Sequence, residues 1–166
     1  RPMIGQLVER RGYRTMCADS FYSTELWSGF AGVIIGSLIP IGIARWSRRK
    51  ERLGELAARV DVPLVLAGSS MGAFVSARVS LQRPVLGLFL MAPPTQLRGF
   101  PLALEAAQVP TRIVHGWDDE LIPVSEVFTW AQARKAHLLM VDDSHRLAAH
   151  VQFCAQEFGR FLQALA

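Results

Sequence analysis

The chain has 166 residues, 51% of them hydrophobic, which is enough for one domain with a packed core. Its 18 basic and 14 acidic residues leave a formal charge of +4. The sequence lacks the long basic run with interleaved aromatic residues that would indicate a nucleic-acid partner. Cys17 and Cys154 lie far apart and outside any C-x-x-C pattern, which argues against a disulfide framework or a zinc site.

This cysteine usage fits a reducing compartment, so we expect a cytoplasmic protein. The sequence begins Arg1-Pro2-Met3 with no signal-peptide pattern, and we expect further residues upstream of it. The apolar spacing predicts a helix over Met3–Arg11, ended by Gly12, and a strand over Tyr13–Cys17.

The segment from Leu26 to Ala44 has no formal charge, and a basic stretch follows it. Aromatic ends and a basic exit are typical of a membrane-spanning helix. An interfacial or partner-binding surface is a second interpretation, and a buried core segment is the third. We favour the core, because several glycines and Pro40 dilute the hydrophobicity and a span here would split one sheet.

The remaining chain alternates helices and strands. The predicted helices are Arg45–Val60, Ala73–Leu81, Leu102–Gln108, Val124–Lys135 and Leu147–Leu165, and the predicted strands are Val62–Ala67, Pro84–Met91, Thr111–His115 and His137–Val141. This alternation predicts an α/β fold, with a mostly parallel sheet and helices on both faces, in a single domain over 1–166. Ligand chemistry is then expected at the carboxyl ends of the strands.

The most informative stretch is Gly68-Ser69-Ser70-Met71-Gly72, between a predicted strand and a predicted helix. A G-x-S-x-G turn in that setting holds the serine hydroxyl outward, and small residues are needed on both sides of the sharp turn. Ser70 is therefore the candidate nucleophile, and the amide of Met71 is a candidate oxyanion donor at the helix start. The alternative is that this stretch is only a structural loop or a helix cap, with no catalytic role.

Two further loops carry the groups that a serine nucleophile needs. Asp118 or Asp119 follows one predicted strand, and His145 follows the last. A histidine there would take the serine proton, and a carboxylate would orient the imidazole. Asp142 and Asp143 are expected to serve the turn, and His115 is expected to be a satisfied structural histidine. No metal-ligand spacing or phosphate loop appears, so we predict no metal and no cofactor.

These motifs together resemble the α/β-hydrolase superfamily, in particular its small, cap-less, bacterial esterase-like members. The elbow around Ser70, the His115-Gly116-Trp117-Asp118-Asp119-Glu120-Leu121-Ile122-Pro123 loop and the loop ending at His145 are similar to the family's three site loops. The resemblance implies a triad of Ser70, Asp119 and His145, with Asp119 preferred over Asp118. It implies a serine hydrolase, of carboxylesterase type, that acts on a small acyl ester or thioester.

The sequence also departs from the family. The strand and loop that supply the second oxyanion donor in the family have no counterpart after Arg1. We expect low activity unless that donor comes from residues upstream of Arg1 or another N–H group replaces it. No room exists for a lid between Met91 and Thr111, and an open site near Pro93, Pro94, Trp117 and Leu121 suggests a small or exposed acyl group. The alternative function is a catalytically silent module that binds a partner or membrane through residues 26–44.

Overall fold

The computed structural model describes residues 15–17, 47–48, 50–51, 54–55, 64–97 and 101–165. Its strands are β1 (Thr15–Cys17), β2 (Val65–Ser69), β3 (Gly87–Met91), β4 (Thr111–Gly116) and β5 (His137–Val141). The helices that it delimits are α3 (Met71–Ser80), α4 (Val124–Arg134) and α5 (Val151–Ala164), with a short 3-10 helix over Ala148–His150. Residues 47–48, 50–51 and 54–55 are helical, in agreement with the helix expected there.

The strands form one parallel sheet in the order β1-β2-β3-β4-β5. Ser69 of β2 is in register with Met91 of β3, and Gly116 of β4 is in register with Val141 of β5. Because these strands are parallel, the loops that follow them leave the same edge of the sheet. The predicted α/β class with a parallel sheet is confirmed.

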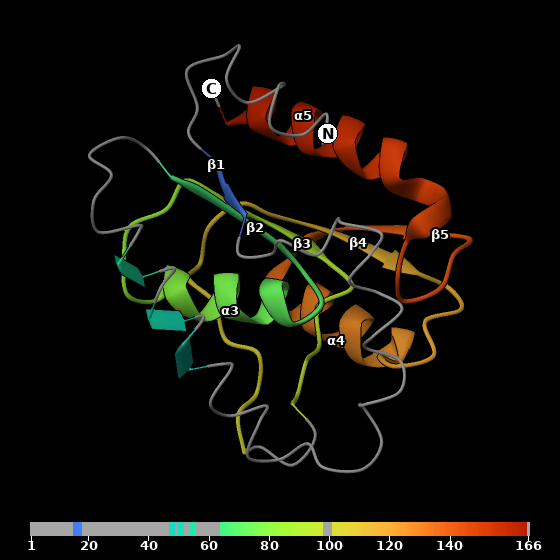
Figure 1. Cartoon of the computed structure of the whole chain (residues 1–166), viewed down its shortest axis with the longest axis horizontal. Helices are drawn as coiled ribbons and strands as arrows, with labels where there is room; N and C mark the ends of the chain where they lie inside the picture. Colours follow the sequence, from blue (N-terminus) through green and yellow to red (C-terminus); the bar gives the residue numbers. More distant parts are fainter. Residues whose placement is uncertain are drawn as a thin grey trace.

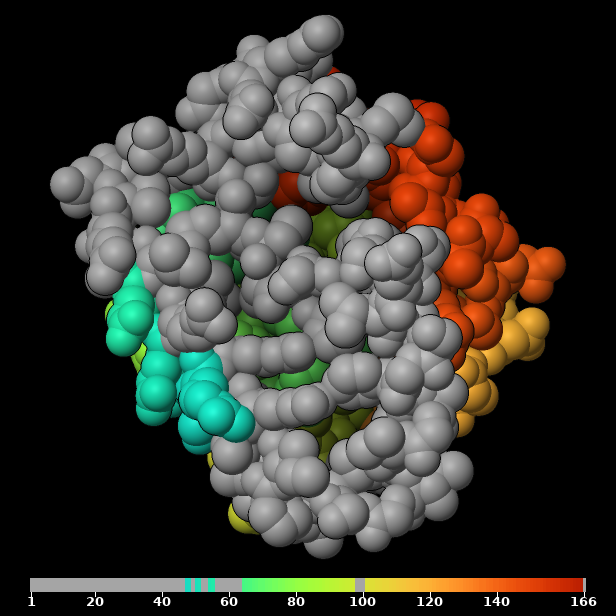
Figure 2. All heavy atoms as spheres, in the orientation of Figure 1, coloured from blue at the N-terminus to red at the C-terminus, as the bar shows by residue number. Residues whose placement is uncertain are grey.

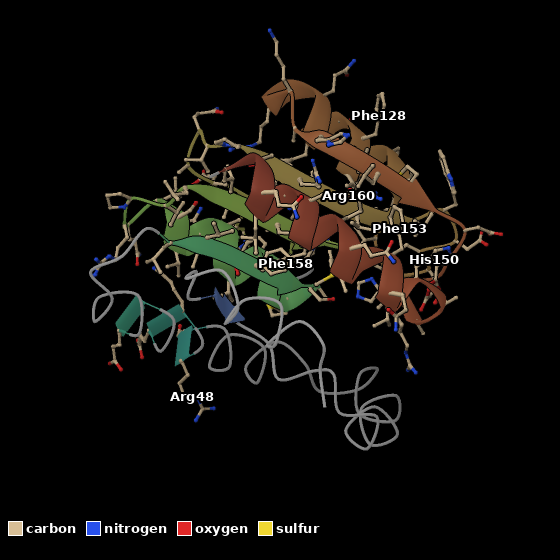
Figure 3. The ribbon with its side chains drawn as sticks, turned by 90° about the horizontal axis from the view of Figure 1, so that it is seen from above. Arg48, Phe128, His150, Phe153, Phe158 and Arg160 are labelled. Carbon is tan, nitrogen blue, oxygen red and sulfur yellow. The ribbon has the colours of Figure 1, made fainter. Side chains whose placement is uncertain are left out.

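Helices cover both faces of the sheet (Figure 1). α3 and α4 pack on one face, where the core includes Phe74, Leu90 and Val127. α5 packs on the other face, where Phe158 lies 5.0 Å from Phe89, centroid to centroid. Seen from the α5 side, α5 lies over the sheet with its axis roughly along the strands, and His150 and Phe153 are at its amino-terminal end (Figure 3). In the space-filling view, the visible part of α5 and the helical residues among 47–55 lie at opposite edges of the view (Figure 2).

The predicted helix over Leu102–Gln108 is wrong, because this segment is an irregular connection. Its backbone groups bond to other parts of the chain instead of to one another. Trp130 Nε1 donates to the Leu104 carbonyl at 2.7 Å, and the Arg134 guanidinium donates to the carbonyls of Ala106 and Ala107.

The last helix begins later than Leu147, the start that the spacing predicted. Leu147 has a φ of 52°, a left-handed conformation that an α-helix does not contain. Asp143 Oδ2 accepts the amide of Ala149 at 2.9 Å and contacts His150 Nδ1 at 3.0 Å, so the chain makes a 3-10 turn before α5.

Two predicted segments, the helix over Met3–Arg11 and the apolar stretch Leu26–Ala44, lie outside the described residues. Within the part of the chain that the structure describes, no helix has the length and apolar character needed to cross a membrane. The three interpretations of the apolar stretch therefore stay open.

Candidate active site

Ser70 lies on a strained turn between β2 and α3. Its backbone has φ 52° and ψ −122°, which non-glycine residues rarely adopt. A Cβ atom on Gly68 would lie 2.3 Å from the carbonyl carbon of Gly72, so the turn closes only with glycine at position 68. The glycine requirement inferred from the motif therefore has a direct steric cause.

Hydrogen bonds continue the sheet ladder past the strand ends and fix the loops that follow. The Ser70 amide donates to the Met91 carbonyl at 2.8 Å, and the Trp117 amide donates to the Val141 carbonyl at 2.8 Å. The Asp118 amide then donates to the Asp143 carbonyl at 3.1 Å, which ties the loop after β4 to the loop after β5. These two loops are consequently held side by side.

Three side chains that are far apart in the sequence meet above this edge. His145 Nδ1 lies 2.8 Å from Asp119 Oδ2, and His145 Nε2 lies 2.8 Å from Ser70 Oγ. A carboxylate only accepts hydrogen bonds, so Nδ1 carries the proton of a neutral imidazole and Nε2 accepts the Ser70 hydroxyl. His145 is 6% exposed, and the Asp119 side chain is fully buried.

The Asp119 carboxylate is held in its ionised form. Burial opposes its charge, but the hydrogen bond and charge of His145 and the amides of Ile122 and Leu121 outweigh burial, and the pKa of Asp119 lies below its ordinary value. Oδ1 accepts those amides at 2.8 and 2.9 Å. Both carboxylate oxygens are therefore occupied, and Oδ2 is the one that faces the imidazole.

The competing acid, Asp118, lies on the surface and contributes its backbone amide to the loop contact. Asp143 serves the turn after β5, as expected, since its Oδ1 accepts the Ser144 amide at 2.8 Å. Its side chain also pairs with His150, a contact that the sequence did not predict.

The surroundings of Ser70 match the expectation in part. Met71 is the first residue of α3, where amides have no intrahelical acceptor, so its amide is placed as an oxyanion donor would be. Its oxyanion role stays a prediction. Trp117 and Leu121 are exposed, whereas Pro93 and Pro94 are buried and offer no open surface.

Sequence reasoning missed Glu120 beside the triad side chains and gave His115 only a structural role. Glu120 Oε2 accepts the backbone amide of His145 at 3.2 Å. The Nε2 atom of His115 lies 3.6 Å from Asp119 Oδ2, while its Nδ1 atom is buried with no hydrogen-bond partner in the described structure. The expectation of a satisfied histidine is therefore wrong for Nδ1. No local spacing signals the contact between His115 and Asp119, because His115 lies in a strand and Asp119 in the loop after it.

Metal-binding side chains do not gather in the described part of the chain, where no group of three or more His, Cys, Asp or Glu residues could hold an ion. Cys154 is buried there, and burial raises the pKa of its thiol to about 11.

Comparisons with known proteins bear on the fold and the family. No family model matches the sequence, and no curated protein matches it either. Among solved structures, the chain is similar to a protein from Xanthomonas campestris pv. campestris that is described as a hydrolase of the alpha/beta superfamily. The identity is 44% over 97% of this chain and 87% of that one, with a TM-score of 0.77.

Two more distant structures have a similar fold. An alpha-beta serine hydrolase homologue from Coxiella burnetii is 27% identical, covers 68% of this chain and 57% of that one, and has a TM-score of 0.56. An esterase from Pyrococcus furiosus is 17% identical, with 75% and 62% coverage and a TM-score of 0.61. The second likeness shows the fold alone. The 44% identity over almost the whole length decides the family: the chain belongs to the alpha/beta superfamily of hydrolases.

Proposed function

We propose that the protein is a serine hydrolase that cleaves carboxylic ester or thioester bonds through an acyl-enzyme on Ser70. The observation that carries the proposal is the pair of 2.8 Å contacts that join Ser70 to His145 and His145 to Asp119. A serine hydroxyl is a weak nucleophile until a base takes its proton, and the first contact supplies that base.

The reaction follows from the proton positions. Ser70 Oγ attacks the acyl carbonyl carbon, and its proton moves to His145 Nε2. The carbonyl oxygen becomes an oxyanion, for which the Met71 amide at the start of α3 is a donor. The tetrahedral intermediate then loses the alcohol or thiol, which takes the proton from Nε2. Water repeats these steps, releases the acid and restores Ser70.

Asp119 stabilises the imidazolium that forms in each step. Its carboxylate stays ionised because the pKa of Asp119 lies below its ordinary value. Burial raises this pKa, but the hydrogen bond and charge of His145, with two backbone amides, lower it by more. The exposed Trp117 and Leu121 flank this acid in the same loop and offer apolar surface to a small acyl or alcohol group. Cytoplasmic location is part of the same proposal.

The test combines a fluorophosphonate probe with hydrolysis of p-nitrophenyl acetate and butyrate. Wild-type protein should be labelled once per chain, and Ser70→Ala should abolish labelling and lower kcat by roughly a thousandfold or more. Ser69→Ala is the matched control, because Ser69 is the adjacent serine at the end of β2. It should be labelled at the wild-type level.

Absence of labelling in folded wild-type protein, or labelling that survives Ser70→Ala, would contradict the proposal. It would favour the catalytically silent binding module instead.

A further inference from the structure

His115 is a buried imidazole at the end of β4 that the mechanism above does not use. The side chain is fully buried, and its Nε2 atom lies 3.2 Å from the Ile122 carbonyl oxygen. A carbonyl only accepts, so Nε2 carries the proton and donates it. Burial lowers the pKa of His115 below its ordinary value, which keeps the ring neutral with the proton on this nitrogen.

One residue, Ile122, is hydrogen-bonded both to His115 and to Asp119. Ile122 accepts from His115 through its carbonyl and donates its amide to Asp119 Oδ1 at 2.8 Å. The other carboxylate oxygen, Oδ2, lies 2.8 Å from His145 and 3.6 Å from His115. A connected path of contacts therefore runs from His115 through Ile122 and Asp119 to His145.

A purely space-filling role does not explain a histidine at this position. The Nδ1 atom of His115 is buried and has no hydrogen-bond partner among the described residues, and a buried polar atom without a partner costs stability. An apolar side chain would fill the same space without that cost. The Nε2–H group, with its contacts to Ile122 and Asp119, is what distinguishes histidine here.

We infer that His115 is a positioning residue for the triad, whose Nε2–H holds the Ile122 carbonyl and thereby keeps the Asp119 carboxylate turned toward His145. This inference rests on the proposed function of the same site. His115 touches neither the substrate nor the reacting atoms, so its effect should fall on kcat and leave KM unchanged.

Two amide variants form a matched pair for the test. His115→Gln places an N–H donor near the position of Nε2, whereas His115→Asn is shorter and reaches only the position of Nδ1. Both remove the imidazole and keep a polar side chain, and p-nitrophenyl acetate turnover is normalised to sites titrated with fluorophosphonate. Unfolded molecules therefore do not enter the comparison.

We expect His115→Asn to lose about tenfold in kcat with KM unchanged, because a small displacement of a supporting group weakens a positioned site. His115→Gln should stay within about threefold of wild type, since one neutral hydrogen bond is preserved. Wild-type kcat in His115→Asn, or an equal loss in both variants, would overturn the inference.

A second readout does not depend on turnover. The His145 Nδ1 proton, held by Asp119, should give a low-field proton resonance in ¹⁵N-histidine-labelled protein. The signal should persist in His115→Gln and broaden or vanish in folded His115→Asn. An unchanged signal in His115→Asn would overturn the inference. Failure of the proposed function is recognised separately, by wild-type protein that neither reacts with the probe nor hydrolyses esters.

Discussion

At the scale of single residues, the backbone of Ser70 shows how the site stores strain. Its φ of 52° and ψ of −122° expose the hydroxyl to His145, and the hydrogen bond that the Ser70 amide donates to the Met91 carbonyl helps to keep the turn in place. Conformations of this kind cost about 1–3 kcal/mol and persist only where the surroundings impose them. The sequence motif indicates such a turn, because glycine at position 68 removes the steric conflict with Gly72.

The strain at Ser70 can be measured by comparing the stabilities of two variants, Ser70→Gly and Ser70→Ala, which both lack the hydroxyl. The free energy of unfolding of Ser70→Gly should be about 1 kcal/mol higher than that of Ser70→Ala, because glycine relieves the strained φ and makes the protein more stable. The gain is reduced by the greater entropy of glycine in the unfolded chain. Urea denaturation of both proteins measures the difference. A Ser70→Gly protein less stable than Ser70→Ala would show that the turn is not strained.

At the scale of elements, the loop after β4 carries Asp119 and packs directly on the loop after β5. A Cβ atom on Gly116 would lie 2.1 Å from the Asp143 carbonyl oxygen, a backbone atom that cannot move by a side-chain rotation. The close approach of these two loops is what brings Asp119 to His145. Glycine at position 116 is therefore a requirement of the site as well as of the fold.

Gly116→Ala should lower both stability and activity. We expect a loss of about 2–4 kcal/mol in unfolding free energy, together with a fall in kcat per titrated site, because the loop after β5 must shift and carries His145 with it. Gly54→Ala is the control, since among the described residues a Cβ atom there meets only Gln82 Oε1, at 3.9 Å. That variant should be neutral or gain up to about 1 kcal/mol. Equal effects of the two substitutions would contradict the steric account.

The element scale is also where sequence reasoning failed. The apolar spacing of Leu102–Gln108 fits a helix, but Trp130 and Arg134 of α4 bond to its carbonyls and hold it in an irregular path. Such bonds join residues about 27 positions apart, which a local pattern does not report. The late start of α5 has a more local cause: the Asp143 carboxylate accepts the amide of Ala149, six residues further on, before the helix begins.

At the scale of the whole molecule, several ionisable side chains that are buried or half-buried connect the elements or lie in the core. Arg112 of β4 pairs with Glu157 of α5 at 3.1 Å and joins the sheet to the helix on that face. Asp143 joins the turn after β5 to His150, and burial lowers the pKa of His115 in the core of the sheet. The stability of the protein should therefore depend on pH in two separate ranges.

Acid should destabilise the fold in two stages. The pKa of His115 is lowered in the folded state, so the unfolded chain binds the additional proton and stability falls as pH drops below about 6.5. The pKa of Asp143 is also lowered, since His150 and two backbone amides outweigh its burial. The stability that the ionised Asp143 contributes is present above about pH 4 and is lost as the pH falls through the pKa of Asp143 in the folded protein.

Urea unfolding at pH 7.5, 5.5 and 3.5 separates these stages. Compared with wild type, His115→Gln should lose less stability between pH 7.5 and 5.5. Asp143→Asn should lose less between pH 5.5 and 3.5. Each variant is the control for the pH range assigned to the other residue. If the unfolding free energy of both variants changed with pH as it does in wild type, the assignment of the two ranges to His115 and Asp143 would be wrong.

The sequence by itself determined the type and order of the main elements, the parallel α/β class and the three loops that bear Ser70, Asp119 and His145. These depend on local periodicity and on glycine-dependent turns, which a sequence records directly. The predicted catalytic roles remain proposals. Only the tertiary structure placed Asp119, which the family resemblance preferred over Asp118, against His145. It also placed Nε2 of His115 against the Ile122 carbonyl, and it showed that residues 102–108 are not helical. Each of these depends on hydrogen bonds between segments that meet only after folding, and a one-dimensional pattern contains no distances between them.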